Sequence, residues 1–494
     1  MRRRTLLWFL AAVLACTAAL ALGCGGKGGK PEPSPKRVFR QFHSRPDLKP
    51  PAVEIDTPAK SNAAPGYIFF GPKKKVKQRG PLIVDNEGNV IWFKQVEPRE
   101  ATDFRAQRYQ GKPVLTWWEG KSDFGIGQGF GVIYDDSYRK IATVHAGNGL
   151  DSDLHEFRLT PRNTALLTIY HKVPADLSKL GGPKQGFAQD GIIQEVDVAT
   201  GKVLFEWHSL PEVPFNESYT PLRKVKKGGK SFYAPYDYFH PNSVFLDPDG
   251  NYLVSARNTR AVYLIGHKTG KILWRLGGKK SDFKMGTGTH FAWQHDAQFH
   301  PDGTLTLFDN ESMPPVGPES RALTFKVDHD AKTVTLLRSY SHPDKILAPH
   351  QGNFQVLPNG NGFVGWGGIA HMTEFSKGGK VVFDAHFSSS IDSYRAYRDE
   401  WHGHPADKPR IAVRGGKAGK VTVYASWNGA TDVSQWRVLA GDNRKSLKTV
   451  READKLGFET EITAKTKGRW IAVEALDSKG DTLGTSKPKS LGHS

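Results

Sequence analysis

Short segments in which apolar and polar residues alternate are separated by turns rich in Gly, Pro, Asn and Asp, from residue 66 to about residue 401. Alternation with a period of two residues is typical of half-buried β-strands, and helical periodicity is nearly absent here. The clearest unit, residues 237–276, contains a strand, a Pro-Asp-Gly turn, a second strand and a further hairpin. The pattern therefore predicts an all-β fold.

Units of this kind align six times on their first turn. Their equivalent segments begin at Gly66, Asp103, His155, Asp237, Trp293 and His350. Repeats of about 40 to 60 residues with four strands each are what a β-propeller requires. The first unit lacks its inner strand, whereas residues 393–401 are left over at the end and would close the ring. We therefore predict a six-bladed β-propeller over residues 61–403, and five or seven blades fit the alignment less well.

A second, smaller domain is expected at the carboxy terminus. It follows the segment Pro-Ala-Asp-Lys-Pro at residues 405–409, and short alternating segments continue from Ile411 onward. This length and pattern predict an immunoglobulin-like or fibronectin-like β-sandwich over residues 410–494. No candidate chemistry is evident in it.

The first residues have the features of an export signal. Three arginines follow Met1, and residues 6–22 form an uncharged apolar run that ends in small residues before Cys24. This arrangement resembles a bacterial lipoprotein signal, so we expect a signal peptide over residues 1–23 and a lipidated Cys24. An uncleaved anchor helix is the alternative, although 17 residues are short for a hydrocarbon layer of about 30 Å.

Residues 24–60 are rich in Gly, Lys and Pro and are expected to form an extended tether. Signal, lipid and tether together predict a protein of the cell envelope, lipid-anchored on the extracytoplasmic face of a bacterial membrane. Of the 2 cysteines, Cys16 lies in the signal, so no internal disulfide is expected in the mature chain.

The chain is strongly basic, with 69 Lys and Arg against 50 Asp and Glu and a formal net charge of +19. The excess occurs in scattered clusters beside glycine, such as residues 73–75, 224–230 and 279–280, which we expect in solvated loops. No nucleic-acid motif accompanies them and export removes the opportunity, so no nucleic-acid partner is expected.

Polar residues recur at equivalent repeat positions, six and eight residues before each turn proline. Side chains alternate along a strand, so these positions share one face of the inner strand, which lines the central channel of a propeller. They are Asp153, His155, His240, Asn242, Trp293, His295, His350 and Gly352, with Asp103 in a less regular unit. The four histidines are expected to face one another, whereas His300 has the opposite parity. Arg257, Asn258, Asn310 and Arg321 stand at the ends of neighbouring strands.

Imidazole, guanidinium and amide groups dominate this set. A divalent ion usually prefers some anionic ligands, and Ca²⁺ prefers a set rich in oxygen ligands. The sequence also contains no close-spaced metal-ligand motif. No metal site is therefore assigned. A cationic pocket rich in hydrogen-bond donors suits an anionic tetrahedral group, such as a sulfate or phosphate ester. A neutral imidazole could act there as nucleophile or base while the other groups stabilise the oxyanions.

Several ordered motifs together resemble the arylsulfotransferase family, in its branch of exported, often lipid-anchored proteins. They are DYFHPNSVFLDPDGNYLVSARN, GKILWRLGGKKSDF, FAWQHDAQFHPDGTLTLFDN, SRALTFKVD, GNFQVLPNGNGFVGWG and SWNGATDVSQWRVLAG. The resemblance implies a six-bladed propeller that transfers a sulfuryl group from a phenolic sulfate donor to a phenol acceptor. It also implies a ping-pong reaction through a sulfohistidine, with no cofactor and without the nucleotide donor phosphoadenosine phosphosulfate.

The resemblance also implies roles for single residues. His240 in FHPNS and His295 in QHDAQF match histidine positions of the family, and Asn310 and Arg321 match polar residues that hold the sulfuryl oxygens. His295 is favoured as the nucleophile, and His240 and His350 remain competitors. His155, Arg257 and Asn258 are expected to bind substrate.

Two other functions stay open from the sequence. One is a non-catalytic, envelope-anchored propeller that binds an anionic ligand or polymer. The net positive charge and the second domain favour this function. The other is a metal-dependent hydrolase.

Overall fold

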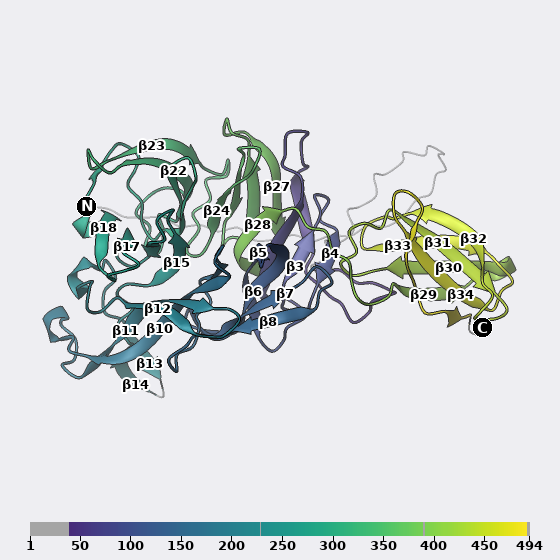
Figure 1. The fold of residues 1–494 in the computed structure, drawn as a ribbon, viewed down its shortest axis with the longest axis horizontal. Helices are drawn as coiled ribbons and strands as arrows, with labels where there is room; N and C mark the ends of the chain where they lie inside the picture. The colour runs from purple at the N-terminus through teal and green to yellow at the C-terminus, as the bar shows by residue number, and fades with distance from the viewer. Residues whose placement is uncertain (1–38, 228, 389–390, 492–494) are drawn as a thin grey trace, which may run out of the picture. The chain divides into compact units, whose positions relative to one another are not determined.

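The computed structural model describes residues 39–227, 229–388 and 391–491 (Figure 1). The chain divides into a unit of residues 1–37 and a unit of residues 38–494. The predicted signal peptide and Cys24 lie outside the described residues. The described residues contain strands β1 to β36, a few short 3-10 turns and no α-helix, which confirms the all-β class. Within them, no helix has the length and apolar character needed to cross a membrane.

The first three sheets of the large β region each contain four antiparallel strands. The first has the order β28-β2-β3-β4, the second β5-β6-β7-β8 and the third β12-β11-β10-β9. Their strands are β2 (Tyr67–Lys74), β3 (Leu82–Val84), β4 (Val90–Phe93), β28 (Ile391–Asp399), β5 (Glu100–Tyr109), β6 (Lys112–Asp123), β7 (Ile126–Tyr134), β8 (Lys140–Val144), β9 (Phe157–Leu159), β10 (Thr164–Ala175), β11 (Gly186–Asp197) and β12 (Val203–His208).

The next three sheets repeat this plan with additions. The fourth has the order β15-β16-β17-β18, the fifth β19-β23-β22-β21-β20 and the sixth β1-β27-β26-β25-β24. Their strands are β15 (Pro241–Leu246), β16 (Tyr252–Ala256), β17 (Ala261–Ile265), β18 (Ile272–Gly277), β19 (Lys284–Met285), β20 (His295–Phe299), β21 (Thr304–Asp309), β22 (Arg321–Asp328), β23 (Thr333–Tyr340), β1 (Val53–Thr57), β24 (Asn353–Val356), β25 (Gly362–Gly365), β26 (His371–Phe375) and β27 (Val381–Phe387). The connections hold the hairpin β13 (Lys224–Lys227) with β14 (Lys230–Tyr233) and the turns η1 (Ser178–Leu180), η2 (Phe215–Glu217) and η3 (Gly278–Lys280).

Strand β28, near the end of this region, completes the sheet that begins it. It pairs antiparallel with β2, with Tyr67 opposite Asp399 and Phe69 opposite Tyr397. The sequence predicted that residues 393–401 would supply the inner strand that the first unit lacks, and this pairing confirms it. β28 is therefore the edge strand of the first sheet beside β2.

Strand β1 shows that the predicted tether is too long. Val53 lies opposite Phe387 on β27, and Leu48 and Val53 are 5% and 4% exposed within the core of the first and sixth sheets. The segment Val-Glu-Ile-Asp-Thr alternates like a strand, and the prolines and lysines around it concealed that pattern. Residues 53–57 therefore belong to a sheet rather than to a tether.

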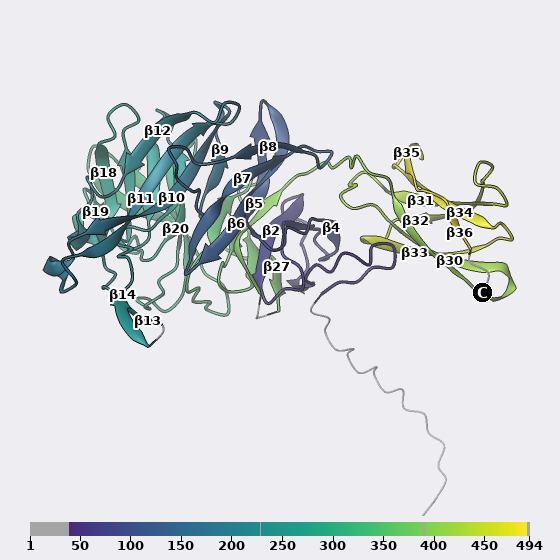
Figure 2. The same cartoon turned by 90° about the horizontal axis from the view of Figure 1, so that it is seen from below.

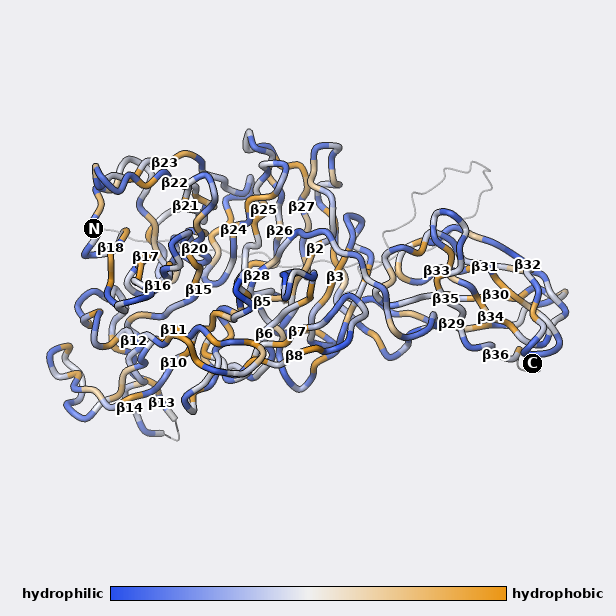
Figure 3. Tube along the Cα trace, viewed as in Figure 1, coloured by the Kyte–Doolittle hydropathy of each residue, from blue (hydrophilic) through white to orange (hydrophobic). Residues whose placement is uncertain are grey.

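Neighbouring sheets share apolar cores. Leu253 and Val262 of the fourth sheet, for example, pack in one cluster with Leu305 and Phe325 of the fifth. Figure 3 shows apolar positions along the strands and polar positions at the connecting turns. Truncation of one such buried leucine to alanine typically costs about 2 to 5 kcal/mol, so these contacts dominate the stability of the region.

The carboxy-terminal strands form two further sheets, drawn as two layers in Figure 2. One has the order β29-β30-β33, and the other β32-β31-β34-β35, with β36 paired to β34. Trp436 and Val473 from one sheet share a core with Val423 and Ile462 from the other. The elements are β29 (Arg410–Gly415), η4 (Lys417–Gly419), β30 (Lys420–Ser426), β31 (Gln435–Gly441), β32 (Lys448–Asp454), β33 (Glu459–Lys465), β34 (Trp470–Leu476), β35 (Thr482–Thr485) and β36 (Lys489–Ser490).

Candidate active site

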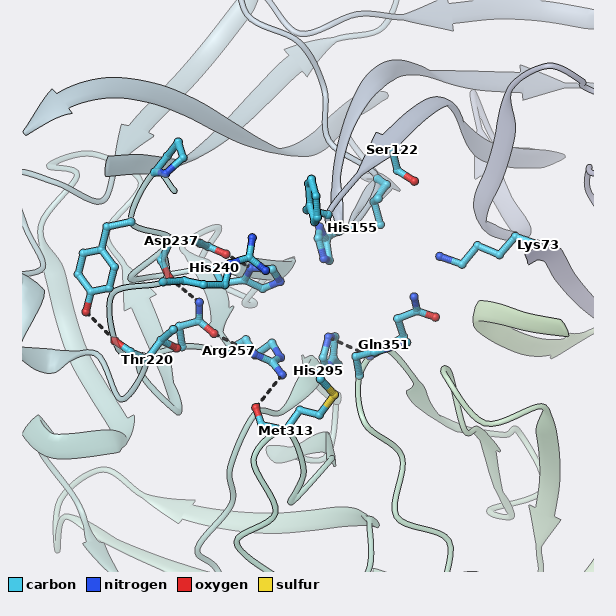
Figure 4. Close-up of a pocket in the computed structure, with 18 of the residues that line it drawn as sticks. Lys73, Ser122, His155, Thr220, Asp237, His240, Arg257, His295, Met313 and Gln351 are labelled. Carbon is cyan, nitrogen blue, oxygen red and sulfur yellow. Dashed lines mark hydrogen bonds and ion pairs between the residues drawn. The ribbon is translucent and has the colours of Figure 1, made fainter. Parts of the chain in front are cut away.

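A cavity of about 560 Å³ opens where the inner strands of several sheets begin (Figure 4). His155, His240, His295 and His350 all line it. His295 is the first residue of β20, and the other three precede β9, β15 and β24 by a few residues. The rings of His155 and His240 lie edge to face with their centroids 4.9 Å apart. The four histidines that the repeat alignment selected are thus brought together.

The imidazole of His295 has a defined tautomer. Its Nδ1 lies 2.7 Å from Oδ1 of Asn310, whose amide nitrogen donates to the carbonyl oxygens of Ala348 and Gln351 at 3.2 and 2.9 Å. With both amide hydrogens engaged, Oδ1 must accept, so Nδ1 of His295 carries the hydrogen and Nε2 carries the lone pair. That lone pair receives only a long contact of 3.3 Å from the backbone N–H of Gln351.

Burial keeps His295 neutral. It lowers the pKa of His295 well below the usual value for imidazole, and the charge of Arg257 acts in the same direction. A neutral imidazole with an unprotonated Nε2 is the form that acts as a nucleophile or a base.

His240 is paired with a carboxylate. Nδ1 of His240 lies 2.5 Å from Oδ2 of Asp237, so Nδ1 carries a hydrogen that the carboxylate accepts, and Nε2 is the nitrogen that can exchange a proton with a substrate. A carboxylate in this position stabilises the positive charge that forms on the imidazole when the ring accepts a proton. His240 adopts a left-handed backbone conformation with φ of 58°, which directs the chain into Pro241 at the start of β15.

His155 has a similar arrangement in a drier setting. Its Nδ1 contacts Oδ1 of Asp153, which also accepts the backbone N–H of His155. Oδ2 of Asp153 accepts the backbone N–H of Gly127. Burial lowers the pKa of His155 well below its usual value and raises the pKa of Asp153 to about 7. Desolvation therefore disfavours charge on both members of this pair.

His350 has the least support from neighbouring side chains. Its buried Nδ1 has no hydrogen-bond partner among the described residues. Burial lowers the pKa of His350 to about 4, helped by the charge of Lys74. The ring is therefore neutral at physiological pH, but no acceptor fixes its tautomer.

Cationic groups outnumber carboxylates around the cavity. Lys73, Lys74, Arg223 and Arg257 line it, against Glu100 and Asp237. Lys74 forms an ion pair of 2.6 Å with Asp392, whereas no hydrogen bond or ion pair engages the ammonium group of Lys73 among the described residues, although Lys73 is only 7% exposed. Figure 4 shows Lys73 reaching toward the cavity from the side opposite His240. A buried cation that lines a cavity and has no partner is suited to binding an anion.

A model of the arylsulfotransferase (ASST) family matches residues 105–388 of the 494-residue chain, a span that includes His155, His240, His295 and His350. The chain belongs to the arylsulfotransferase family. Membership indicates a sulfotransferase whose substrates are small aryl sulfates and phenols. The family resemblance drawn from the sequence is therefore confirmed, although the motif SWNGATDVSQWRVLAG lies outside the matched span.

Other comparisons add little to this arylsulfotransferase assignment. No curated protein matches the sequence. Among solved structures, a protein of unknown function from Bacteroides caccae is 13% identical with a TM-score of 0.39, covering 67% of this chain and 98% of that chain. Virginiamycin B lyase from Staphylococcus aureus is 10% identical with a TM-score of 0.34, covering 76% and 96%. Likenesses this weak carry no argument about function.

Of the other polar residues selected from the sequence, Arg257 and Asn258 line the cavity and Asn310 does not. Asn258 accepts from the Arg257 guanidinium at 2.9 Å while donating to the carbonyl oxygen of Asp237. Asn310 is buried behind His295 and acts on it by hydrogen bonding. Asn258 and Asn310 therefore position other site residues.

Arg321 is not among the residues that line the cavity. Its guanidinium lies 2.6 Å from Asp309 and 3.2 Å from Glu311, and it donates to the carbonyl oxygen of His290 at 2.9 Å. The structure thus does not place it where it would hold sulfuryl oxygens, because nearby carboxylates engage its side chain. Burial and the charge of Glu311 raise the pKa of Asp309 to about 8.

Two features of the cavity were missed in the sequence. Lys73 was assigned to a solvated loop with its neighbours, but it lies on β2 with its side chain enclosed. Phe124, at the turn between β6 and β7, lines the cavity and is 81% exposed. Its only sequence signal is a large aromatic residue inside the polar turn Lys-Ser-Asp-Phe-Gly. With Met313, which is 56% exposed, it gives the rim apolar surface that suits an aromatic ring.

Proposed function

We propose that this protein transfers a sulfuryl group from an aryl sulfate ester to a phenol in two steps, through a sulfohistidine at His295 and without phosphoadenosine phosphosulfate. The observation that carries the proposal is the tautomer of His295, which presents an unprotonated Nε2 to a cavity lined by cations. Family membership supports the substrate class.

In the first step, Nε2 of His295 attacks the sulfur atom of the donor. The S–O bond to the aryl group breaks, and the departing phenolate takes a proton from Nε2 of a protonated His240. In the second step the acceptor phenol gives its proton to His240, its oxygen attacks sulfur, and the S–N bond breaks. His240, with Asp237 behind it, thus alternates between acid and base.

The neutral side chain of Asn310, which is hydrogen-bonded to His295, affects how readily the sulfohistidine gives up its sulfuryl group. Sulfation of Nε2 leaves a positive charge on the imidazole, since Nδ1 keeps its hydrogen. Asn310 orients that N–H without neutralising the charge, so the ring remains a good leaving group for the second step. A carboxylate in the same place, as at His240, would stabilise the cation and slow its departure. This difference favours His295 over His240 as the nucleophile.

The cationic side chains around the cavity bind the anionic donor. Lys73 and Arg257 attract the sulfate ester, and the apolar rim at Phe124 contacts its aromatic ring. Hydrogen-bond donors aimed at the sulfuryl oxygens stabilise charge as the transfer proceeds.

Intact-mass analysis tests the proposal directly. The protein is incubated with para-nitrophenyl sulfate alone, and a mass increase of one sulfuryl group is expected, located at His295 by peptide sequencing. Addition of phenol should discharge it as phenyl sulfate. The His295→Ala variant should show neither event, and a sulfated His350 or His240 in the native protein would overturn the assignment.

The second candidate is a non-catalytic protein that binds an anionic ligand or polymer. The unpaired ammonium group of Lys73 favours it, since that group serves binding as well as catalysis. In that case calorimetry would detect binding of the aryl sulfate while no sulfated protein formed.

We further propose that the six sheets close into a six-bladed propeller. Arg395 on β28 lies 2.9 Å from Asp103 of the second sheet, 3.2 Å from Glu156 beside the third, and donates to the carbonyl oxygen of Asn242 on the fourth at 3.0 Å. One side chain that meets this many sheets supports a common axis. A β-sandwich over residues 410–494 is proposed from the shared core of the two carboxy-terminal sheets.

Export, cleavage before Cys24 and lipid attachment at that residue are proposed on the sequence alone. They would place the protein on the extracytoplasmic face of a bacterial membrane. Metabolic labelling with a fatty acid should mark the native protein and leave the Cys24→Ala variant unlabelled.

A further inference from the structure

Two histidines and an aspartate meet at the sixth sheet, outside the cavity. His342 lies in the connection after β23, His371 begins β26, and Asp384 lies within β27. Oδ2 of Asp384 is 3.3 Å from Nε2 of His342 and 3.9 Å from Nδ1 of His371, and the three ligand atoms lie within 4.8 Å of one another. Among the described residues, no other group of three such side chains comes this close.

Two members of this cluster are buried, and the third, His371, has a side chain that is 25% exposed. His342 is 5% exposed and Asp384 is 6% exposed. Nδ1 of His371 is buried and has no hydrogen-bond partner among the described residues. A buried polar atom without a partner is costly, so an unpaired imidazole nitrogen directed at a carboxylate and a second imidazole points to a missing ligand.

The neighbours of the cluster hold its rings and carboxylate in place. Asp384 accepts the Thr373 hydroxyl on Oδ1 at 2.6 Å, and that hydroxyl in turn accepts the Trp366 indole N–H at 2.9 Å. Oδ2 of Asp384 is thereby directed at the two imidazoles and contacts Nε2 of His342. The His371 ring stacks on His386 at 5.3 Å, and His386 is itself 2.6 Å from Asp56. Supporting contacts of this kind orient the ligands of protein metal sites.

We propose that His342, His371 and Asp384 bind one zinc-type divalent metal ion. Two imidazole nitrogens and one carboxylate oxygen suit Zn²⁺, whereas Ca²⁺ and Mg²⁺ prefer sets of oxygen ligands. Ligands about 2.0 to 2.1 Å from a tetrahedral ion lie roughly 3.3 Å apart. The two separations that include Asp384 are 3.3 and 3.9 Å, and the two imidazole nitrogens lie within 4.8 Å of each other, so the side chains would have to move closer by at most about 1.5 Å. The fourth position takes a water molecule.

Metal binding needs one proton to change place. Nδ1 of His342 accepts the backbone N–H of Asp344 at 3.1 Å, so without metal its hydrogen stands on Nε2, facing Asp384. When Nε2 binds the ion, the hydrogen moves by solvent exchange to Nδ1. Oδ2 of the exposed Asp344 lies 3.8 Å from Nδ1 of His342 and can accept the hydrogen bond from that nitrogen. The backbone N–H of Asp344 then donates to water instead.

The proposed ion joins parts of the chain that are distant in sequence. The connection that carries His342 continues to His350 and Gln351 at the cavity, whereas His371 and Asp384 belong to the sixth sheet. The ion would therefore anchor this connection to the sheet. The role is structural, and the inference does not rest on sulfuryl transfer.

Metal binding by the full chain tests the proposal. The purified protein is stripped with a chelator, dialysed and titrated with Zn²⁺ in a calorimeter, and one saturable site per chain is expected. The melting temperature should rise with Zn²⁺ concentration. With Co²⁺, the visible absorption of a four-coordinate ion should appear.

Two variants and one control decide the outcome. His371→Ala and Asp384→Asn should each weaken Zn²⁺ binding at least tenfold. His371→Ala removes the unpaired nitrogen, so it should remain folded, as circular dichroism would show. His267→Ala changes a histidine of the fourth sheet and should bind as the native protein does. Absence of a saturable site in the native protein, or equal binding by His371→Ala, would overturn the proposal.

Discussion

Oδ1 of Asn310 lies 2.7 Å from Nδ1 of His295, and the amide hydrogens of Asn310 are held by two backbone carbonyl groups. The amide cannot rotate without losing these bonds, so the histidine keeps its hydrogen on Nδ1. Asn310, which does not line the cavity, thus keeps Nε2 of His295 unprotonated where that atom faces the cavity.

Asn310→Ala should lower kcat for sulfuryl transfer by roughly 100-fold or more, because the tautomer of His295 is no longer selected. Asn310→Asp should keep the tautomer but stabilise the charged sulfohistidine, so sulfated protein should accumulate before the acceptor step. Rapid quench with intact-mass detection measures both. Asn251→Ala, in a turn of the fourth sheet, is the control, and equal effects there would contradict the assigned role.

His240→Gln should reduce kcat by roughly 100- to 10,000-fold, since it removes the group that exchanges protons with the phenols. The reduction should be larger with phenyl sulfate than with para-nitrophenyl sulfate, because the better leaving group needs less protonation. Steady-state rates with both donors check this dependence. A loss of equal size for both donors would show that His240 has no role as an acid.

Lys73→Met should raise KM for the aryl sulfate by about tenfold, with a smaller change in kcat, because an unpaired cation that lines the cavity is removed. Lys75→Met removes the same charge from an exposed position two residues away and should leave KM near its native value. If both variants behave alike, net charge rather than a contact at the cavity explains the effect.

His350 should make the protein sensitive to acid. Its pKa is about 4 in the folded state and about 6.5 when unfolded, so the unfolded state binds the proton more tightly. Stability is therefore lost as the pH falls from about 6.5 toward 4, by about 2 kcal/mol at pH 5. Urea unfolding at pH 7 and pH 5 should show a smaller difference for His350→Gln than for the native protein. His402→Gln, an exposed histidine, should preserve the native difference.

The repeat alignment selected four histidines that the structure brings to one cavity, and the reason is physical. Equivalent turns place equivalent strand starts at the same level of each sheet, so a period of two and a count from the turn proline were enough to select His155, His240, His295 and His350. The missing strand of the first sheet was predicted because residues 393–401 were left over at the end of the repeats, and β28 supplies it.

Side chains whose positions depend on distant partners escaped this reasoning. Arg321 is at the start of a strand like its counterparts, but Asp309 and Glu311 hold its guanidinium. Lys73 resembles its exposed neighbours in sequence, and only the packing around β2 encloses it. The tether boundary was wrong because the pairing of β1 with β27 joins residues more than 300 positions apart.

Local alternation and turn spacing in the sequence therefore determined the all-β class, the repeated hairpins and the four histidines near the strand starts, since these depend on neighbouring residues. Tertiary structure decided which nitrogen of His295 is free, which cation stays unpaired, and that His342, His371 and Asp384 meet. These properties depend on hydrogen-bond partners and burial supplied by other strands, and no local pattern encodes them.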